Sequence, residues 1–133
     1  MRTFDTEDVN VIVGGIALTG FAEGSFVKAE RNEDNFTEYV GAKGEVAVSE
    51  SNDRTGEITV TLESTSPSVI YLTDLANRKG VNAIVPVQIV DLNQNAIQVG
   101  GSECRVRKPA TYEADKEISE REFVFFVADL QFK

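Results

Sequence analysis

Histidine and tryptophan are missing from the 133-residue sequence, and cysteine occurs only once. Without histidine, the chain lacks the commonest general base, the commonest metal ligand and the usual nucleophile–histidine pairs. The single Cys104 excludes an internal disulfide and cannot build a zinc site. The sequence therefore predicts a protein that is not an enzyme and that holds neither a metal nor a cofactor.

Long apolar runs are also lacking. No stretch approaches the ~18 residues that a membrane-spanning helix needs. The N-terminus turns acidic at Asp5, so it has no apolar signal-peptide core. Gly14 and Gly15 lie in neither a GxxxxGK[ST] nor a GxGxxG pattern, which argues against a phosphate-binding loop. We expect no membrane span and a protein that stays in the compartment where it is made.

Cations are scarce, with 13 Lys and Arg against 22 Asp and Glu and a net charge of −9. A nucleic-acid-binding surface needs clustered cations, and the only cluster is Arg105, Arg107 and Lys108. The composition therefore argues against a DNA-binding protein. Three acidic groups, at 5–8, 30–34 and 117–122, lack the spacing of an EF-hand loop. Solvated surface charge is the preferred interpretation, with a weak calcium site or a hidden carboxylate pair as alternatives.

The dominant pattern in the sequence has a period of two. Ile58, Val60 and Leu62 alternate with polar residues, which predicts a strand with one buried and one polar face. A similar alternation over 45–49 is separated from it by the turn-rich segment 52–56, so we predict a hairpin of 45–49 with 57–63. Further strands are predicted at 9–13, 16–19, 25–31, 84–91, 96–99, 102–108 and 122–132. The last of these has two apolar faces, and both need covering.

One segment has helical spacing instead. Ser66 and Pro67 are typical of a helix start, Leu72 and Ala76 share one helical face, and a glycine at position 80 is a typical stop. We predict one helix over 67–79, packed against the sheets. The predicted fold class is mainly β with one flanking α-helix, and a chain without catalytic residues acts through its surfaces.

Several short motifs occur together in a fixed order. They are VGG (13–15), TGFAEG (19–24), ERNEDNFT (30–37), VGAKGEV (40–46), SNDRTGEITVTL (51–62), TSPS (65–68), PV (86–87) and DLN (91–93). Each motif is weak alone, but their order and spacing resemble the tail tube proteins of contractile-tailed (myovirus-type) phages, small structural proteins formerly of unknown function. ADL (128–130) is also similar to the family's ending. The resemblance covers nearly the whole chain.

The resemblance implies a β-sandwich or partly closed barrel with one flanking helix, with residues 1–133 as a single tail tube domain. It implies six-membered rings that stack into a hollow tube inside a contractile sheath and conduct DNA out of the virion. The implied partners are further copies of the chain, the tail sheath protein, baseplate or tube initiator and tail terminator proteins, and DNA as non-specific cargo. The implied location is the phage tail, assembled in the host cytoplasm.

The physical reading of the chain agrees with such an assembly. Strands with exposed edges are an aggregation hazard unless they are paired, and a closed ring removes them. A negatively charged lumen would repel phosphates and let a duplex slide, whereas a positive one would hold it. We therefore expect an acidic lumen.

Two sets of residues are candidates for roles in this assembly. The first makes inter-subunit contacts from an N-terminal arm (1–8), an extended loop (32–43) and the C-terminus, and comprises Arg2, Phe4, Asn35, Phe36, Thr37, Tyr39 and Phe132. The second lines the lumen from the polar face of the predicted hairpin, and comprises Glu45, Ser49, Glu57, Thr59, Thr61 and Glu63. The alternative for this second set is the outer surface of a sandwich.

Other functions stay open at this stage. A tube initiator, a baseplate component or the tube of a DNA-free tailocin would use the same fold, and fold alone does not decide function. A monomeric β-sandwich binding module is a different class, and it would show a concave pocket with converging polar groups.

Overall fold

The computed structural model describes residues 3–24, 26–93 and 98–133. The strands are β1 (Val9–Val13), β2 (Ile16–Ala17), β3 (Val27–Arg31), β4 (Phe36–Val40), β5 (Val46–Glu50), β6 (Gly56–Glu63), β7 (Val85–Asp91), β8 (Gln98–Val106), β9 (Glu120–Val127) and β10 (Gln131–Phe132). The helices are α1 (Ser68–Asn77) and the short 3₁₀ segments η1 (Thr6–Asp8) and η2 (Gly80–Ala83). The prediction of a mainly β chain with one α-helix is confirmed.

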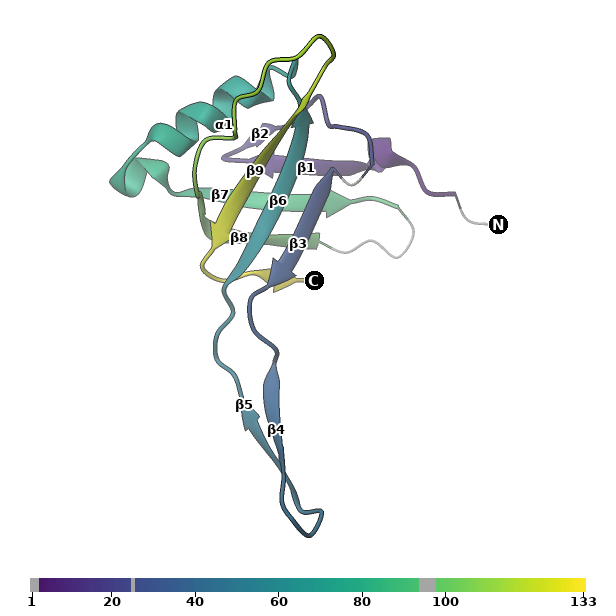
Figure 1. Cartoon of the computed structure of the whole chain (residues 1–133), viewed down its shortest axis with the longest axis vertical. Coiled ribbons are helices and arrows are strands. Elements are labelled where there is room, and N and C mark those ends of the chain that lie inside the picture. Colours follow the sequence, from purple (N-terminus) through teal and green to yellow (C-terminus); the bar gives the residue numbers. More distant parts are fainter. Residues whose placement is uncertain (1–2, 25, 94–97) are drawn as a thin grey trace.

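Eight strands form one sheet that folds over into two layers. The strand order is β2-β1-β7-β8-β9-β6-β3, with β10 paired to β8, and all neighbours are antiparallel. Figure 1 shows β1, β7 and β8 crossing behind the steeply inclined β9, β6 and β3. The sheet is open between β2 and β3, so the arrangement is a sandwich with a shared corner and does not close into a barrel.

The corner lies in β8, which pairs with β7 along its first part and with β9 through Cys104–Val106. A Cβ on Gly101 would come within 2.5 Å of a methyl group of Val127, so only glycine lets the layers approach this closely. The sequence predicted two strands here, at 96–99 and 102–108, and this is wrong because the ladder with β7 continues through the glycines. Residues 96–97 lie outside the described residues.

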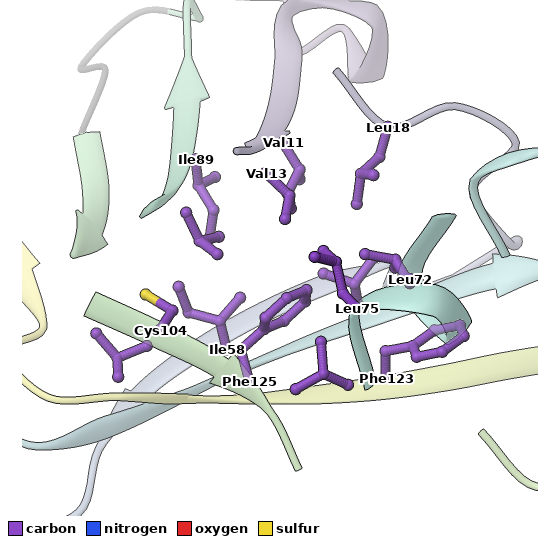
Figure 2. Close-up of a cluster of buried hydrophobic side chains, with 14 of the residues drawn as sticks. Val11, Val13, Leu18, Ile58, Leu72, Leu75, Ile89, Cys104, Phe123 and Phe125 are labelled. Carbon is purple, nitrogen blue, oxygen red and sulfur yellow. The ribbon is translucent and has the colours of Figure 1, made fainter. Parts of the chain in front are cut away.

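The core lies between the two layers (Figure 2). Alternation on β6 places Ile58, Val60 and Leu62 in it, and β9 contributes Phe123 and Phe125. Every one of these side chains is fully buried. At about 25 cal/mol per Å² of apolar surface, burial of each large side chain stabilises the fold by about 2 kcal/mol. The predicted inner face of the β6 strand is therefore confirmed.

The C-terminal strand is shorter than the predicted 122–132. β9 ends at Val127, and β10 then pairs with β8 instead of continuing the ladder with β6. The break occurs because Leu130 turns inward, is fully buried and donates its N–H to the Arg54 carbonyl at 2.9 Å.

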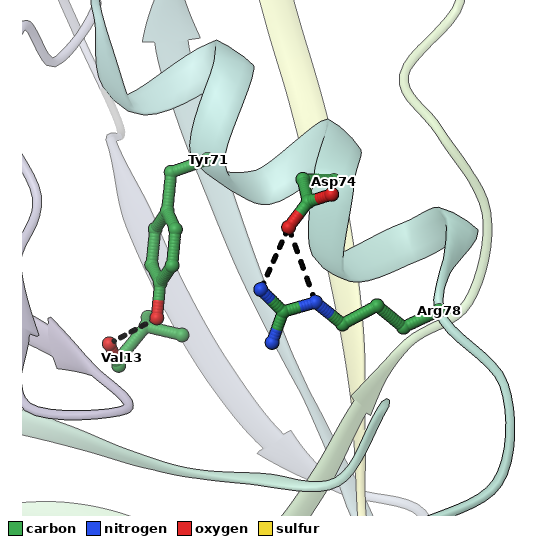
Figure 3. A network of polar contacts seen from close by, with 4 residues as sticks. All are labelled: Val13, Tyr71, Asp74 and Arg78. Carbon is green, nitrogen blue, oxygen red and sulfur yellow. Dashed lines mark hydrogen bonds and ion pairs between the residues drawn. The ribbon is translucent and has the colours of Figure 1, made fainter. Parts of the chain in front are cut away.

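The helix closes one side of the sandwich. It begins within a residue of the predicted Pro67 and ends two residues before Lys79, and Leu72 and Leu75 pack into the core. The Tyr71 hydroxyl donates to the Val13 carbonyl at 2.9 Å, which ties the helix to β1 (Figure 3).

Candidate assembly surfaces

The polar face of β6 points away from the core. Glu57, Thr59, Thr61 and Glu63 alternate with the buried residues of the same strand and lie on one face. The structure thus brings together four of the six residues predicted to line a lumen. Their position in a channel stays a prediction.

Neighbouring strands extend this face and make it acidic. Register places Glu30 of β3 beside Glu57, and Glu122 and Glu120 of β9 beside Thr61 and Glu63. The cations on this part of the face are Lys28, Arg105 and Arg107. This part of the face therefore carries three cations and five carboxylates, namely Glu30, Glu57, Glu63, Glu120 and Glu122.

Two of these cations are paired with carboxylates. Arg107 meets Glu57 at 2.7 Å, and its guanidinium lies 5.3 Å from the centre of the Phe126 ring. Lys28 lies 3.5 Å from Glu30. Exposed pairs of this kind contribute little stability, on the order of 0–1 kcal/mol each. Their consequence is electrostatic: they neutralise two carboxylates and leave the negative charge concentrated near the start of β9.

A two-stranded hairpin, β4–β5, projects from the end of β3 and β6 (Figure 1). The predicted pairing of 45–49 with 57–63 is wrong, because β5 pairs with β4 while β6 pairs with β3 and β9. The turn lies at 41–44, where Gly44 adopts a positive φ of 85° that favours glycine. Part of the predicted loop 32–43 is therefore strand β4.

The base of the hairpin is tied to the body by side chains. The Asn32 amide donates to the Thr55 hydroxyl at 3.0 Å, and the Arg31 guanidinium donates to the Leu130 carbonyl at 3.0 Å. Asp53 accepts bonds from both the hydroxyl and the backbone N–H of Thr55, and these two bonds lower the pKa of its carboxyl. The turn-rich residues at 52–56 thus brace an extended connection and do not reverse the chain.

Register defines two faces on the hairpin. One face carries four apolar side chains that are at least half exposed, namely Phe36, Val40, Val46 and Val48, together with Glu38 and Glu50. The other carries Thr37, Tyr39, Ala47 and Ser49.

The six residues predicted to line a lumen do not all lie on one surface. Glu45 and Ser49 belong to the hairpin and are separated from the β6 face that they were predicted to share. Asn35 is at the hairpin base, where its carbonyl accepts the Ser51 N–H at 2.8 Å. The apolar set Val40, Val46 and Val48 was missed, although Val40 and Val46 flank a Gly-x-x-Gly turn in the sequence.

A groove of about 380 Å³ opens between β3 and the other layer, on the side of the sandwich away from α1. Phe4 and Phe132, two predicted contact residues from opposite ends of the chain, both line it, together with Phe26 and Val99. The side chain of Asn93 fixes the start of the chain by bonding both backbone groups of Asp5. Arg2 lies outside the described residues.

Among the strands that the structure describes, β3 forms a free edge of the sheet. Its bonded pairs with β6 include the Thr61 N–H to the Phe26 carbonyl and the Asn32 N–H to the Thr55 carbonyl. Since bonded pairs alternate in an antiparallel ladder, the N–H groups of Val27, Ala29 and Arg31 point away from β6. They form a row of donors available to another strand.

Among the described residues, no metal-binding cluster is found and the one cysteine is buried. Within them, no group of three or more Cys, Asp or Glu side chains is placed to hold a metal ion. Burial raises the pKa of the Cys104 thiol to about 11, so it stays protonated and unreactive near neutral pH. None of the helices in the described part of the chain has the length and apolarity needed to cross a membrane.

Comparisons with known proteins identify one family and several solved structures with a similar fold. The model of a family described as bacteriophage PhiTE tail tube protein matches residues 3–131. No curated protein sequence matches the chain significantly. Among solved structures, the chain resembles a protein of the sheath/tube terminator of an extracellular contractile injection system (PVC) in its extended state. The TM-score is 0.68 at 15% identity, covering 100% of this chain and 98% of the other.

Two further structures are similar. One comes from the PVC sheath–tube complex in the extended state, with TM-score 0.62, 12% identity and coverage of 98% and 91% of the two chains. The other comes from the tube-terminating cap of the anti-feeding prophage, with TM-score 0.62, 14% identity and coverage of 100% and 92%. At these identities the likeness establishes the fold.

Proposed function

Because this chain belongs to the tail tube family represented by the bacteriophage PhiTE protein, we propose that it forms the inner tube of a contractile phage tail. Six copies join into a ring, and rings stack into a hollow conduit through which DNA leaves the virion. The role is structural and involves no catalysed reaction. The sheath, the baseplate or tube initiator, and the tail terminator are the proposed partners, and assembly takes place in the host cytoplasm.

The free edge of β3 is the observation that carries this proposal. A strand edge with three outward N–H groups is a template for strand addition and an aggregation hazard in a monomer. The same layer has a second open margin at the start of β9. Its ladder with β8 covers only the end of β9, at Phe125–Val127, and the last bond beyond it joins the Arg107 N–H to the Val124 carbonyl. Pairing of β3 with the start of β9 in the next copy would make one continuous sheet around a ring.

Closure through these two margins would turn the polar face of β6 toward the axis. The face carries more carboxylates than cations, so the ring would present a negative wall that repels phosphates. We expect Glu63→Lys tubes to retain DNA at low salt and to release it as salt rises. Glu45→Lys, the same charge change on the hairpin, is the matched control and should retain none. Equal retention of DNA by both variants would contradict the position of the β6 face in the lumen.

Negative-stain electron microscopy of the purified protein over a concentration series tests the assembly. We expect stacked hollow rings of uniform diameter. Single rings that never stack would favour the alternative of a tube initiator or baseplate component. Compact monomers at every concentration would contradict the tube, and would favour a monomeric binding module that uses the groove beside β3.

A further inference from the structure

The two open sides of the sandwich differ in how they are closed. On one side, α1 inserts Leu72 and Leu75 between the layers, and both side chains are buried. On the opposite side, the groove beside β3 stays open although its walls are mainly apolar. Phe132 is 46% exposed there and Phe4 is 66% exposed. The chain thus covers its own core on one side of the sandwich only.

The same chain carries an unpartnered apolar surface elsewhere. Among the described residues, the hairpin face formed by Phe36, Val40, Val46 and Val48 stays at least half exposed, and β4 and β5 pair only with each other. A two-stranded ribbon is marginally stable in water without a third partner for its apolar face. The hairpin points away from the body, so it cannot fold back onto the groove of its own chain (Figure 1).

Resting on the tube function above, we propose that the groove beside β3 in one copy receives the apolar face of the β4–β5 hairpin from another copy. The groove of about 380 Å³ accommodates the side chains of that face, while the ribbon backbone lies across its mouth. β4 and β5 have five residues each, so each strand of the hairpin is about 16 Å long at the usual strand rise. This length is enough for the hairpin to cross the groove, whose walls are single strands.

Charge supports this choice of occupant. The hairpin face carries Glu38 and Glu50 beside its apolar side chains. Lys28 and Asp91 both line the groove, and Lys28 also pairs with Glu30 of its own strand. Arg31 lies at the groove edge with its guanidinium 5.7 Å from the centre of the Phe132 ring. The acidic ribbon face can therefore pair with Arg31 at the groove edge.

The contact has a definite symmetry. Hairpin and groove are two different surfaces of one chain, so the interface is heterologous and a joined pair of copies keeps one free hairpin and one free groove. Such a contact propagates from copy to copy and does not stop at a dimer. It also places Phe4 and Phe132 in the same interface as Phe36, although these residues lie far apart within one molecule.

Mixed cysteine cross-linking tests the contact in the full chain. Val48→Cys and Ala29→Cys proteins are purified separately, mixed under assembly conditions and oxidised. Ala29 lines the groove, and the native Cys104 is only 1% exposed, so it stays out of the reaction. Thr37→Cys, on the opposite face of the same hairpin, replaces Val48→Cys in the control mixture. We expect a disulfide-linked pair in the first mixture and less than about a tenth of that yield in the control, because disulfides require Cα atoms within about 7 Å.

The outcomes separate this contact from the tube function. Tubes that assemble but give equal cross-linking, or none, in the two mixtures would overturn the groove contact and leave the tube intact. A protein that stays monomeric in electron micrographs would overturn both. As a second measurement, Val48→Asp should raise the concentration needed for assembly about tenfold, since it removes a buried apolar contact. Ser49→Asp, its neighbour on the other face, should change that concentration less than about twofold, and equal effects would again contradict the contact.

Discussion

Proline at Ala29 tests whether the edge of β3 joins subunits. The Ala29 N–H points away from β6, because bonded pairs of this ladder fall at the even-numbered residues of β3. Ala29→Pro therefore removes no bond within the monomer, and proline is tolerated in an edge strand when its nitrogen faces solvent. We expect the free energy of unfolding to fall by about 1 kcal/mol or less, which lowers Tm by about 4 °C.

Assembly should respond much more strongly than stability. In a ring closed through β3, the substitution leaves a carbonyl of the adjoining strand without its donor, which costs about 1–3 kcal/mol per interface. That corresponds to a loss of about 5- to 150-fold in the association constant at each interface, and a ring repeats the loss. We expect no tubes in electron micrographs at concentrations where the unmodified chain forms them.

Glu30→Pro is the matched control, since its N–H lies on the β6 side of the ladder. It should destabilise the monomer by about 3 kcal/mol in thermal unfolding, because it removes a ladder bond and strains β3. If Ala29→Pro assembles at the same concentration as the unmodified chain, β3 does not pair between subunits and the ring described above is wrong.

Three further predictions concern the monomer. Gly101→Val should lower the free energy of unfolding by about 3 kcal/mol in denaturant titrations, because its side chain would collide with Val127 at the corner of the sheet; an unchanged midpoint would contradict the close packing there. Cys104, whose thiol pKa is raised to about 11 by burial, should not react with a thiol reagent at pH 8 until the protein is unfolded, and rapid reaction of the folded chain would show that it is accessible. The pKa of Asp53 is lowered in the folded state by its bonds from Thr55, so its contribution to stability is present above the unfolded value of 3.8 and is lost as pH falls through the lower folded value. NMR titration of the Asp53 carboxyl checks this, and a pKa at or above 3.8 would show that the bonds are absent in solution.

Alternation along β6 was enough to predict that strand and both of its faces. The strand is paired on both sides over most of its length, so burial of Ile58, Val60 and Leu62 on one face leaves a clear period of two. The helix was predictable for a similar local reason, since it begins at Ser68, directly after the predicted Pro67, and its inward residues fall at the expected spacing. Segments whose own residue pattern determines which side chains are buried were therefore predicted from the sequence.

Strand pairing was not predictable in the same way. Val46 and Val48 alternate as a buried strand would, yet both are more than half exposed, so their pattern could not reveal which strand they pair with. The turn-rich residues at 52–56 looked like a chain reversal, but bonds from Thr55 to Asp53 stabilise an extended connection there. Phe4 and Phe132 both line the groove. No local sequence pattern relates two residues that lie so far apart along the chain.

The join between hairpin and body also sets how the molecule carries mechanical load. The hairpin continues from the ends of β3 and β6, so tension along it pulls β6 along its own axis (Figure 1). β6 is held by eight registered pairs with β9, and a pull along the strand loads all of these pairs in shear at once. A pull across the strand would open them one after another, as in a zipper. A filament that transmits force from copy to copy through its hairpins would therefore load each subunit in its stronger direction.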